Sequence, residues 1–247
     1  KGNTMKTKIL TGSIIAAYAV LNTPALAEEV ILDPIVVSAD FREKSLSETT
    51  NSVSVIGEEK IYDKASAGFE EVIGKAPNVN FTNGGSRAHH IQIRGIGERS
   101  QFQYPLNPSV GLYVDGMDFS NSALAVTLFD VNQIEVLKGP QGTTFGAYGM
   151  AGVINVQSNE PTKETEGHVE ATVGNYNTKA FGAAVGGTLI EDTLLGRISV
   201  YKNTSDGYMT NTTLNLDDTN NIDELTAKAH LRWLASDNHT IDFNYMH

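Results

Sequence analysis

The last third of the chain alternates apolar and polar residues with a period of two. From Leu225 to Trp233 every second residue is apolar, and the residues between them are Thr, Lys, His and Arg. This period predicts a β-strand with one apolar and one polar face. The same alternation marks four further strands, around Val169–Val173, Phe181–Val185, Ile198–Val200 and Ile241–Tyr245. We therefore expect a strand-rich region from Glu166 onward.

The connections between these strands differ in length. Those at Gly174–Thr178, Glu191–Thr193 and Ala235–Asn238 are short, whereas Asn203–Asp223 is long and polar. Periodicity alone is typical of both a water-soluble sandwich and an outer-membrane barrel. Short periplasmic turns alternating with long extracellular loops favour the barrel. Five strands cannot close a barrel, because the smallest have about eight, so we expect an amino-terminal fragment.

The middle of the chain, from about Phe41 to Pro161, has mixed periodicity and many glycines. Helices are predicted from Gly57 and over Gly68–Lys75, where Pro77 ends the second one. The predicted strands are Ser52–Val55, His90–Arg94, Val110–Val114, Gln133–Leu137 and Val153–Ser158. A small α+β domain is the expected result.

The amino-terminal residues are typical of a secretory signal. In Met5–Ala27, two lysines precede an apolar run, Ile9–Leu21, and small residues end at Ala27. The alternative is a membrane anchor, but the run is shorter than the roughly 20 residues of a bilayer span. We expect cleavage after Ala27, with Lys1–Thr4 as an upstream extension or cloning remnant.

The net charge and the amino-acid composition exclude several kinds of functional site. The net charge of -11 gives no electrostatic reason for nucleic-acid binding, and the absence of cysteine excludes thiolate metal sites, cysteine nucleophiles and disulfides. The segment Lys138–Gly146, KGPQGTTFG, lacks the Gly-Lys-Ser/Thr ending of a phosphate-binding loop. No enzyme chemistry is predicted.

Four motifs occur in a specific order along the chain: DPIVVSAD (33–40), QIRGIG (92–97), VGLYVDGM (110–117) and IEVLKGPQGTTFGAYGMAGVINVQSNEPT (134–162). Together they resemble the plug domain of TonB-dependent receptors. The resemblance implies an α+β plug domain at 41–162, followed at 163–247 by the first five or so antiparallel transmembrane β-barrel strands. The complete barrel of that family has about 22 strands.

The resemblance also assigns roles to residues of this sequence. In a periplasmic leader at 28–40, the TonB box would be Asp33, Pro34, Ile35, Val36, Val37, Ser38 and Ala39. Its β-branched residues suit pairing with a strand of TonB by β-augmentation. Arg94, Glu135 and Lys138 match family positions that form ion pairs between plug and barrel; the alternative is that they solvate strand ends.

In the family, loops at the extracellular apex of the plug contact the ligand. Here these are Asn83–His90 and Gly97–Pro108. The candidate ligand-binding residues are Arg87, Arg99, Phe102 and Tyr104. Arginine with aromatic residues suits an anionic, ring-bearing iron chelate.

No resident metal or covalent cofactor is expected. His89 and His90 are strand neighbours and point to opposite faces, which disfavours a shared metal ion. Asp217, Asp218 and Asp223 are interpreted as a solvated acidic loop rather than a calcium site.

The expected function is TonB-dependent uptake of a ferric siderophore across the outer membrane of a diderm bacterium. Its expected partners are TonB with the inner-membrane energising complex, the chelate and outer-membrane lipid. The alternatives are cobalamin, haem or a sugar as ligand, or a surface-binding protein without transport. A signal transducer is disfavoured, because only Glu28–Leu32 separate the cleavage site from the TonB box.

Overall fold

The computed structural model describes residues 36–37, 44–46, 48–62, 68–83, 88–99, 106–121, 126–236 and 238–247. The predicted signal and most of the leader lie outside these residues. Among the described residues, no helix is long and apolar enough to cross a membrane.

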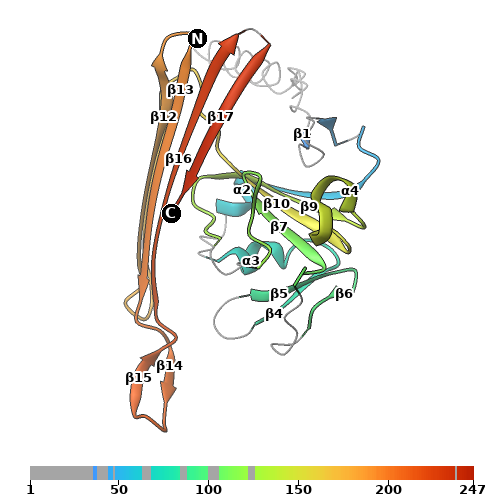
Figure 1. The fold of residues 1–247 in the computed structure, drawn as a ribbon. Coiled ribbons are helices and arrows are strands. Elements are labelled where there is room, and N and C mark those ends of the chain that lie inside the picture. Colours follow the sequence, from blue (N-terminus) through green and yellow to red (C-terminus); the bar gives the residue numbers. More distant parts are fainter. Residues whose placement is uncertain are drawn as a thin grey trace, which may run out of the picture. The chain divides into compact units, whose positions relative to one another are not determined.

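The α+β region is built on a five-stranded sheet with the order β3-β9-β10-β7-β8 (Figure 1). Its strands are β3 (Ser52–Gly57), β9 (Val131–Lys138), β10 (Gly152–Ser158), β7 (Val110–Val114) and β8 (Met117–Asp118). Only the β10–β7 pair is parallel among the pairs of this sheet. Four of the five strands predicted for the middle of the chain lie in this sheet, as β3, β7, β9 and β10, and the fifth, predicted at His90–Arg94, lies in the second sheet of this region.

Smaller elements complete this region. A three-stranded antiparallel sheet contains β4 (Val79–Asn83), β5 (Ala88–Ile93) and β6 (Ile96–Gly97). The helices are α2 (Glu58–Tyr62), α3 (Phe69–Ile73), α4 (Gly142–Phe145) and the 3₁₀ helix η2 (Gly146–Tyr148). Helix α3 stops one turn before Pro77, at Gly74, whose amide donates to the Glu70 carbonyl oxygen.

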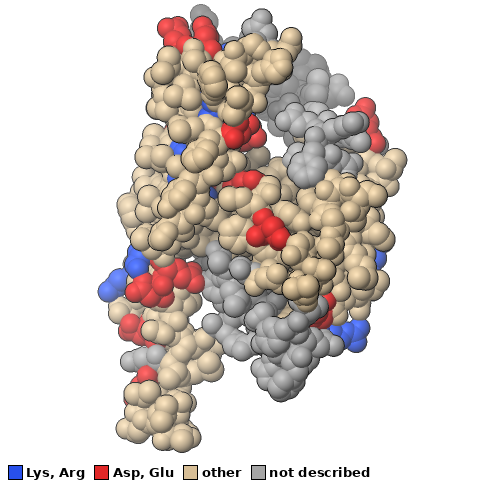
Figure 2. Space-filling model, viewed as in Figure 1, with Lys and Arg blue, Asp and Glu red and all other residues tan. Residues whose placement is uncertain are grey.

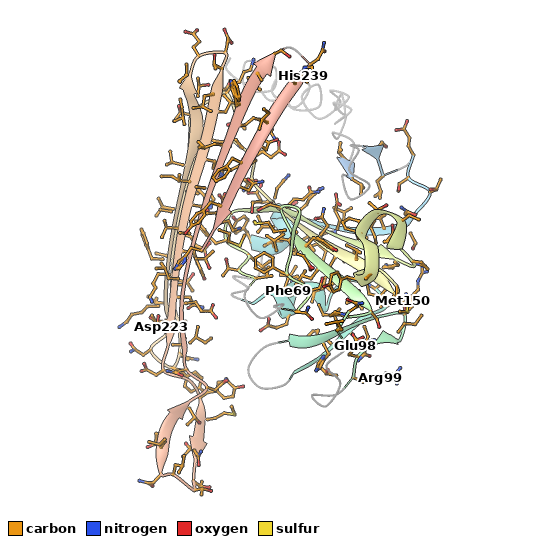
Figure 3. The ribbon with its side chains drawn as sticks, viewed as in Figure 1. Phe69, Glu98, Arg99, Met150, Asp223 and His239 are labelled. Carbon is orange, nitrogen blue, oxygen red and sulfur yellow. The ribbon has the colours of Figure 1, made fainter. Side chains whose placement is uncertain are left out.

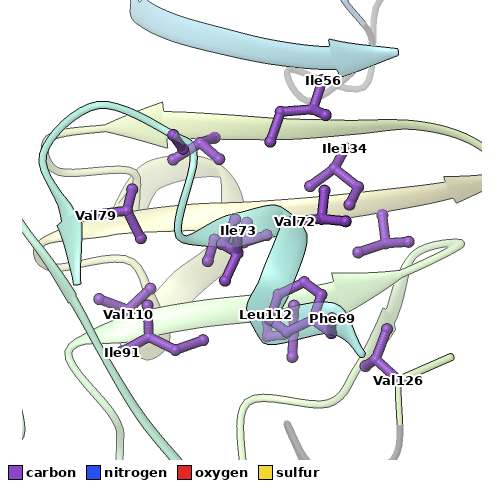
Figure 4. Close-up of a cluster of buried hydrophobic side chains, with 14 of the residues drawn as sticks. Ile56, Phe69, Val72, Ile73, Val79, Ile91, Val110, Leu112, Val126 and Ile134 are labelled. Atoms are coloured by element: carbon purple, nitrogen blue, oxygen red, sulfur yellow. The ribbon is translucent and has the colours of Figure 1, made fainter. Parts of the chain in front are cut away.

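The main core lies between the large sheet and α3. Ile134 and Val136 of β9 face Phe69, Val72 and Ile73 of α3, and all five are at least 99% buried (Figure 4). Leu137 of β9 faces the opposite side, where a second cluster contains Val37, Phe145 and Val153. Because both faces of β9 are covered, its sequence shows no apolar–polar alternation.

The strand-rich region forms one antiparallel sheet with the order β11-β12-β13-β16-β17. The strands are β11 (Glu166–Val173), β12 (Lys179–Ile190), β13 (Leu194–Ser205), β16 (Ile222–Ser236) and β17 (His239–Met246). The five predicted strands are confirmed. β13 and β16 pair from Leu194↔Trp233 to Ser205↔Ile222, so they extend into the stretch predicted as loop.

The rest of that stretch contains a hairpin that alternation did not reveal. It consists of β14 (Met209–Asn211) and β15 (Leu216–Thr219). Polar strands satisfy their backbone groups by pairing even when neither face is buried, so hydrophobic periodicity gives no signal for them. Figure 2 shows charged side chains of both signs where the long strands meet this hairpin. Lys202 of β13 and Asp223 of β16 form an ion pair.

One face of the strand-rich sheet, β11-β12-β13-β16-β17, leaves its apolar side chains exposed. These residues are Val169, Val173, Phe181, Val185, Ile198, Val200, Leu225, Leu231, Trp233, Ile241, Phe243 and Tyr245. A soluble sandwich would cover such a face with a second sheet, whereas a transmembrane barrel presents it to lipid. The other face carries buried residues that contact the α+β region, including Ala180, Arg197 and Tyr201.

Candidate functional site

The segment predicted to couple to TonB begins the described chain. Val36–Val37 form strand β1, which pairs antiparallel with β2 (Lys44–Ser45). The Val37 side chain is 5% exposed and packs in the second core cluster with Leu137, while Gln133 Nε2 donates to the Val36 carbonyl oxygen at 3.0 Å. The extended conformation expected for these two residues is present. Asp33, Pro34, Ile35, Ser38 and Ala39 lie outside the described residues.

Glu135 lies on the same face of β9 as Gln133 and Leu137, and 0% of its surface is exposed. Its Oε1 accepts hydrogen bonds from Gln133 Nε2 at 2.8 Å and Gln157 Nε2 at 3.2 Å, and its Oε2 accepts one from Asn155 Nδ2 at 3.2 Å. A buried carboxylate is tolerated only where polar partners replace water. These amides of β9 and β10 therefore hold the carboxylate inside the sheet.

Arg94 and Lys138 lie together on the face of the sheet opposite to Glu135. Arg94 has a left-handed backbone, with φ of 54°, and its Nη2 donates to Ser52 Oγ at 2.9 Å. Lys138 Nζ donates to Ser54 Oγ at 2.7 Å, two residues further along β3. Burial and then the charge of Arg94 lower the pKa of Lys138. The structure thus brings together two cations of the predicted trio and separates them from Glu135.

Among the described residues, neither Arg94 nor Lys138 has a carboxylate partner. Their nearest polar partners are the serine hydroxyls of β3. The ion pairs of Arg94, Glu135 and Lys138 with a barrel wall stay a prediction.

A different ion pair joins the α+β region to the strand-rich region. Arg197 of β13 contacts both carboxylate oxygens of Asp130, through Nε at 3.0 and 3.2 Å and through Nη2 at 2.6 Å. The two side chains are 5% and 3% exposed. Asn159 Nδ2 also donates to Asp130 at 3.0 Å, and Arg197 Nη1 donates to Glu166 at 3.0 Å.

Burial would raise the pKa of Asp130, but the hydrogen bonds from Arg197 and Asn159 and the positive charges of Arg197 and Lys228 outweigh it, so the pKa lies below its usual value. The carboxylate is therefore ionised at neutral pH. This paired, hydrogen-bonded arrangement is the form in which a buried ion pair is tolerated.

Two further cations of the strand-rich sheet reach the α+β region from β16. Lys228 Nζ donates to the Phe129 carbonyl oxygen at 3.1 Å and to Ser158 Oγ at 3.0 Å. Arg232 Nη1 donates to Glu160 at 2.6 Å, and its Nε donates to Asp242 of β17 at 2.7 Å. Cations of the sheet thus meet acceptors of the α+β region.

An aromatic contact accompanies these polar ones. The Phe129 ring is stacked on Tyr201 with centroids 5.3 Å apart and an interplanar angle of 16°. A Cβ added to Gly182 would lie 2.3 Å from the Phe129 ring, so only glycine admits this ring against β12. Sequence reasoning missed Asp130, Arg197 and Phe129. The available signal for Arg197 was its position as a cation on the polar face of a predicted strand, a position that Lys228 and Arg232 share on a later strand.

The described part of the predicted ligand apex lies around β6. Arg99 is exposed, and its Nη2 donates to the Gly95 carbonyl oxygen at 2.8 Å. Glu98, which lies beside Arg99 in Figure 3, accepts at Oε1 from the Ser109 amide at 3.0 Å and from Ser109 Oγ at 2.8 Å. Arg87, Phe102 and Tyr104 lie outside the described residues.

Three of the candidate metal ligands have described side chains. His90 is buried in β5, and Asp217 and Asp223 lie near the exposed hairpin. In the part of the chain that the structure describes, no group of three His, Cys, Asp or Glu side chains is arranged to hold a metal ion.

Comparison with known families identifies the α+β region. Residues 45–153 match the family model "TonB-dependent Receptor Plug Domain". This chain contains a TonB-dependent receptor plug domain. The α+β plug followed by antiparallel strands therefore confirms the predicted fold class, and receptors of this kind are transporters rather than enzymes.

The plug domain and the following strands resemble those of named receptors. The chain is 27% identical over 210 residues to the pesticin receptor of Yersinia pestis, covering 85% of this chain and 30% of that receptor. It is 28% identical over 139 residues to the vitamin B12 transporter BtuB of Vibrio vulnificus, covering 56% and 22%. The chain spans less than a third of the length of either protein.

Solved structures agree on the plug and the strands beyond it. The ferric yersiniabactin uptake receptor FyuA from Yersinia pestis superposes with a TM-score of 0.70 and 26% identity, over 81% of this chain and 32% of that one. The ferripyoverdine receptor of the outer membrane of Pseudomonas aeruginosa has a TM-score of 0.67 at 18% identity, over 86% and 27%, which supports the fold alone.

Proposed function

We propose that this chain is part of a receptor that takes up a ferric siderophore across the outer membrane of a diderm bacterium. The observation that carries the proposal is the extended segment Val36–Val37 directly before a plug domain. A plug closes a barrel lumen, and transport requires that an outside agent move it. An extended, β-branched segment on the chain leading into the plug is suited to receive that force.

TonB is the proposed partner of Asp33–Ala39, together with the inner-membrane complex that energises it. Strand addition joins two chains through main-chain hydrogen bonds and places alternate side chains in pockets. Pro34 has no amide hydrogen, so pairing would begin beyond it. The signal at Met5–Ala27 would deliver the protein to the periplasmic side of the outer membrane, where TonB can reach this segment.

An iron chelate is the proposed cargo. Receptors for ferric yersiniabactin and ferripyoverdine are among the similar structures, and Arg99 is exposed at the apex of the plug. Arg87, Phe102 and Tyr104 are the further proposed contacts with an anionic chelate. The similarity to the vitamin B12 transporter BtuB supports cobalamin as the second candidate, ahead of haem or a sugar.

Ion pairs with the barrel wall are proposed to hold the plug closed. Arg94 and Lys138 place two positive charges side by side, and burial already disfavours the charged form of Lys138. A carboxylate of the wall near these two cations would stabilise both charges. Glu135 is proposed to form its ion pair with the barrel wall from the other face of β9.

The decisive experiment measures uptake of labelled ferric siderophore by cells whose receptor carries Val36→Pro. Proline removes the amide hydrogen needed for strand pairing, so we expect binding at the cell surface to persist and uptake to stop. Val36→Thr keeps both the amide and the β-branched side chain, and it should transport normally.

Undiminished uptake by the Val36→Pro receptor would show that this segment does not couple to TonB. A receptor that binds ligand but never transports it, even with the natural Val36, would instead be a surface-binding protein. Replacing the siderophore by labelled cobalamin in the same assay separates the two ligand classes.

A further inference from the structure

The side chain of Gln133 touches both the coupling segment and the buried carboxylate of the plug. Its Nε2 lies 3.0 Å from the Val36 carbonyl oxygen, 2.8 Å from Glu135 Oε1 and 2.9 Å from Gln157 Oε1. The three acceptors come from β1, β9 and β10. Gln133 is therefore the point where the coupling segment meets the interior of the sheet.

An amide nitrogen has two hydrogens, so three acceptors must share them. While Val36 is bound, its carbonyl oxygen competes with the oxygens of Glu135 and Gln157 for the two hydrogens of the Gln133 amide. When Val36 leaves, the two hydrogens can serve Glu135 and Gln157 fully. The departure of β1 therefore leaves neither amide hydrogen of Gln133 without an acceptor, and an unsatisfied donor is what usually makes the loss of a hydrogen bond costly.

The docked segment is also unsuited to strand addition. The Val36 carbonyl is already occupied by Gln133, and the Val37 side chain is buried against Leu137, Phe145 and Val153. Strand addition needs free main-chain groups and side chains that can enter pockets of the partner. A partner strand must therefore displace these contacts before it pairs with β1.

We propose that Gln133 is a positioning residue that holds the coupling segment against the plug and sets how often it detaches. The hydrogen bond from the Gln133 amide to the Val36 carbonyl and the burial of Val37 hold the segment, and the sharing of the Gln133 hydrogens makes it releasable. This inference rests on the proposed role of Asp33–Ala39 in coupling.

The test measures exposure of the segment in the whole receptor, in outer membranes from cells that lack TonB. The chain contains no cysteine, so Val37→Cys provides one labelling site in it, at a side chain that is only 5% exposed while β1 is docked, and it leaves the Val36 carbonyl in place. The rate of maleimide labelling at this position is compared in three backgrounds: natural Gln133, Gln133→Met and Gln157→Met.

Methionine has nearly the shape of glutamine but no amide. We expect Gln133→Met to raise the labelling rate about fivefold, the effect of one hydrogen bond of ordinary net strength. Gln157→Met is the matched control, because Gln157 donates to the same Glu135 carboxylate from β10. It should lower the heat resistance of the plug as much as Gln133→Met does, yet it should not raise the labelling rate, because it removes an acceptor that competes with the Val36 carbonyl for the Gln133 hydrogens.

An unchanged rate in Gln133→Met would overturn the proposal, as would an equal rise in both variants, which indicates general loosening of the plug. Because TonB is absent, this outcome is independent of the uptake assay with Val36→Pro. Raised labelling combined with undiminished Val36→Pro uptake would keep the positioning role of Gln133 and remove only the coupling function.

Discussion

Asp130 and Arg197 are 67 residues apart in sequence and form a buried ion pair with three contacts of 2.6–3.2 Å. Asp130 directly precedes β9 of the plug, and Arg197 is the fourth residue of β13. Asn159 and Glu166 complete the hydrogen bonds of the pair. This contact attaches the end of the β9–β10 hairpin to the strand-rich sheet.

Removing one member of the pair should destabilise the attachment strongly. Arg197→Met leaves the Asp130 carboxylate buried without its cation, a change that costs about 3–5 kcal/mol. The expected result is a lower temperature at which the plug becomes susceptible to protease in the purified receptor. Glu160→Gln is the control, because the Glu160 side chain is 57% exposed in its pair with Arg232 and such pairs contribute about 0–1 kcal/mol.

The double variant Asp130→Leu with Arg197→Met should be more stable than Arg197→Met alone, because it removes the unpaired charge together with its partner. Equal stability of the single and double variants would argue that the pair contributes only through packing.

The same pair predicts a dependence on acid. The pKa of Asp130 is lowered on folding, so its stabilisation is complete above the ordinary value of 3.8 and is lost as the pH falls through the lower folded-state value. Protease resistance of the plug should therefore be constant near neutral pH and should fall only in strong acid. Asp130→Asn should lack this acid-dependent step; an identical step in the variant would assign it to other carboxylates.

The contact between Phe129 and β12 predicts that Gly182 cannot be replaced. Gly182→Ala places a methyl group 2.3 Å from the Phe129 ring, and such overpacking typically costs about 1–3 kcal/mol. The melting temperature of the receptor, measured by calorimetry, should fall. Gly174→Ala is the control, because its added methyl would meet Thr178 at an ordinary 3.5 Å. Phe129→Leu in the Gly182→Ala background should restore part of the loss.

Arg94 is predicted to help keep the plug closed. Arg94→Ala removes one of the two neighbouring cations that donate to serines of β3, and with it any pairing of Arg94 to the barrel wall. We expect cells with this variant to become more permeable to a large antibiotic that the outer membrane normally excludes. Unchanged permeability would count against the proposed ion pairs.

Arg99 is predicted to act on ligand binding rather than on closure. Arg99→Ala removes an exposed cation at the apex, and the affinity for an anionic ferric chelate should fall about tenfold or more, since hydrogen bonds to charged groups contribute about 1.5–3 kcal/mol. Titration of the purified receptor with the ferric siderophore measures this affinity. Permeability to the antibiotic should stay as in the natural protein, which separates this effect from that of Arg94→Ala.

The sequence by itself determined the elements whose signal is local. Alternation along 225–233 and its four counterparts specified five strands and their apolar face, because side chains of a strand point alternately to its two sides. Ordered motifs at 92–97, 110–117 and 134–162 specified the plug domain. The β-branched residues Val36 and Val37 specified an extended segment.

Only the tertiary structure decided which distant residues meet. Asp130 pairs with Arg197 because the register of β13 points that arginine toward the plug, and no periodicity within either segment contains this information. Glu135, whose family role was an ion pair with the barrel, lies among the amides of Gln133, Asn155 and Gln157 because two adjacent strands, β9 and β10, bring them to one face. Local patterns specify strands and faces, whereas contacts between them depend on how the faces are brought together.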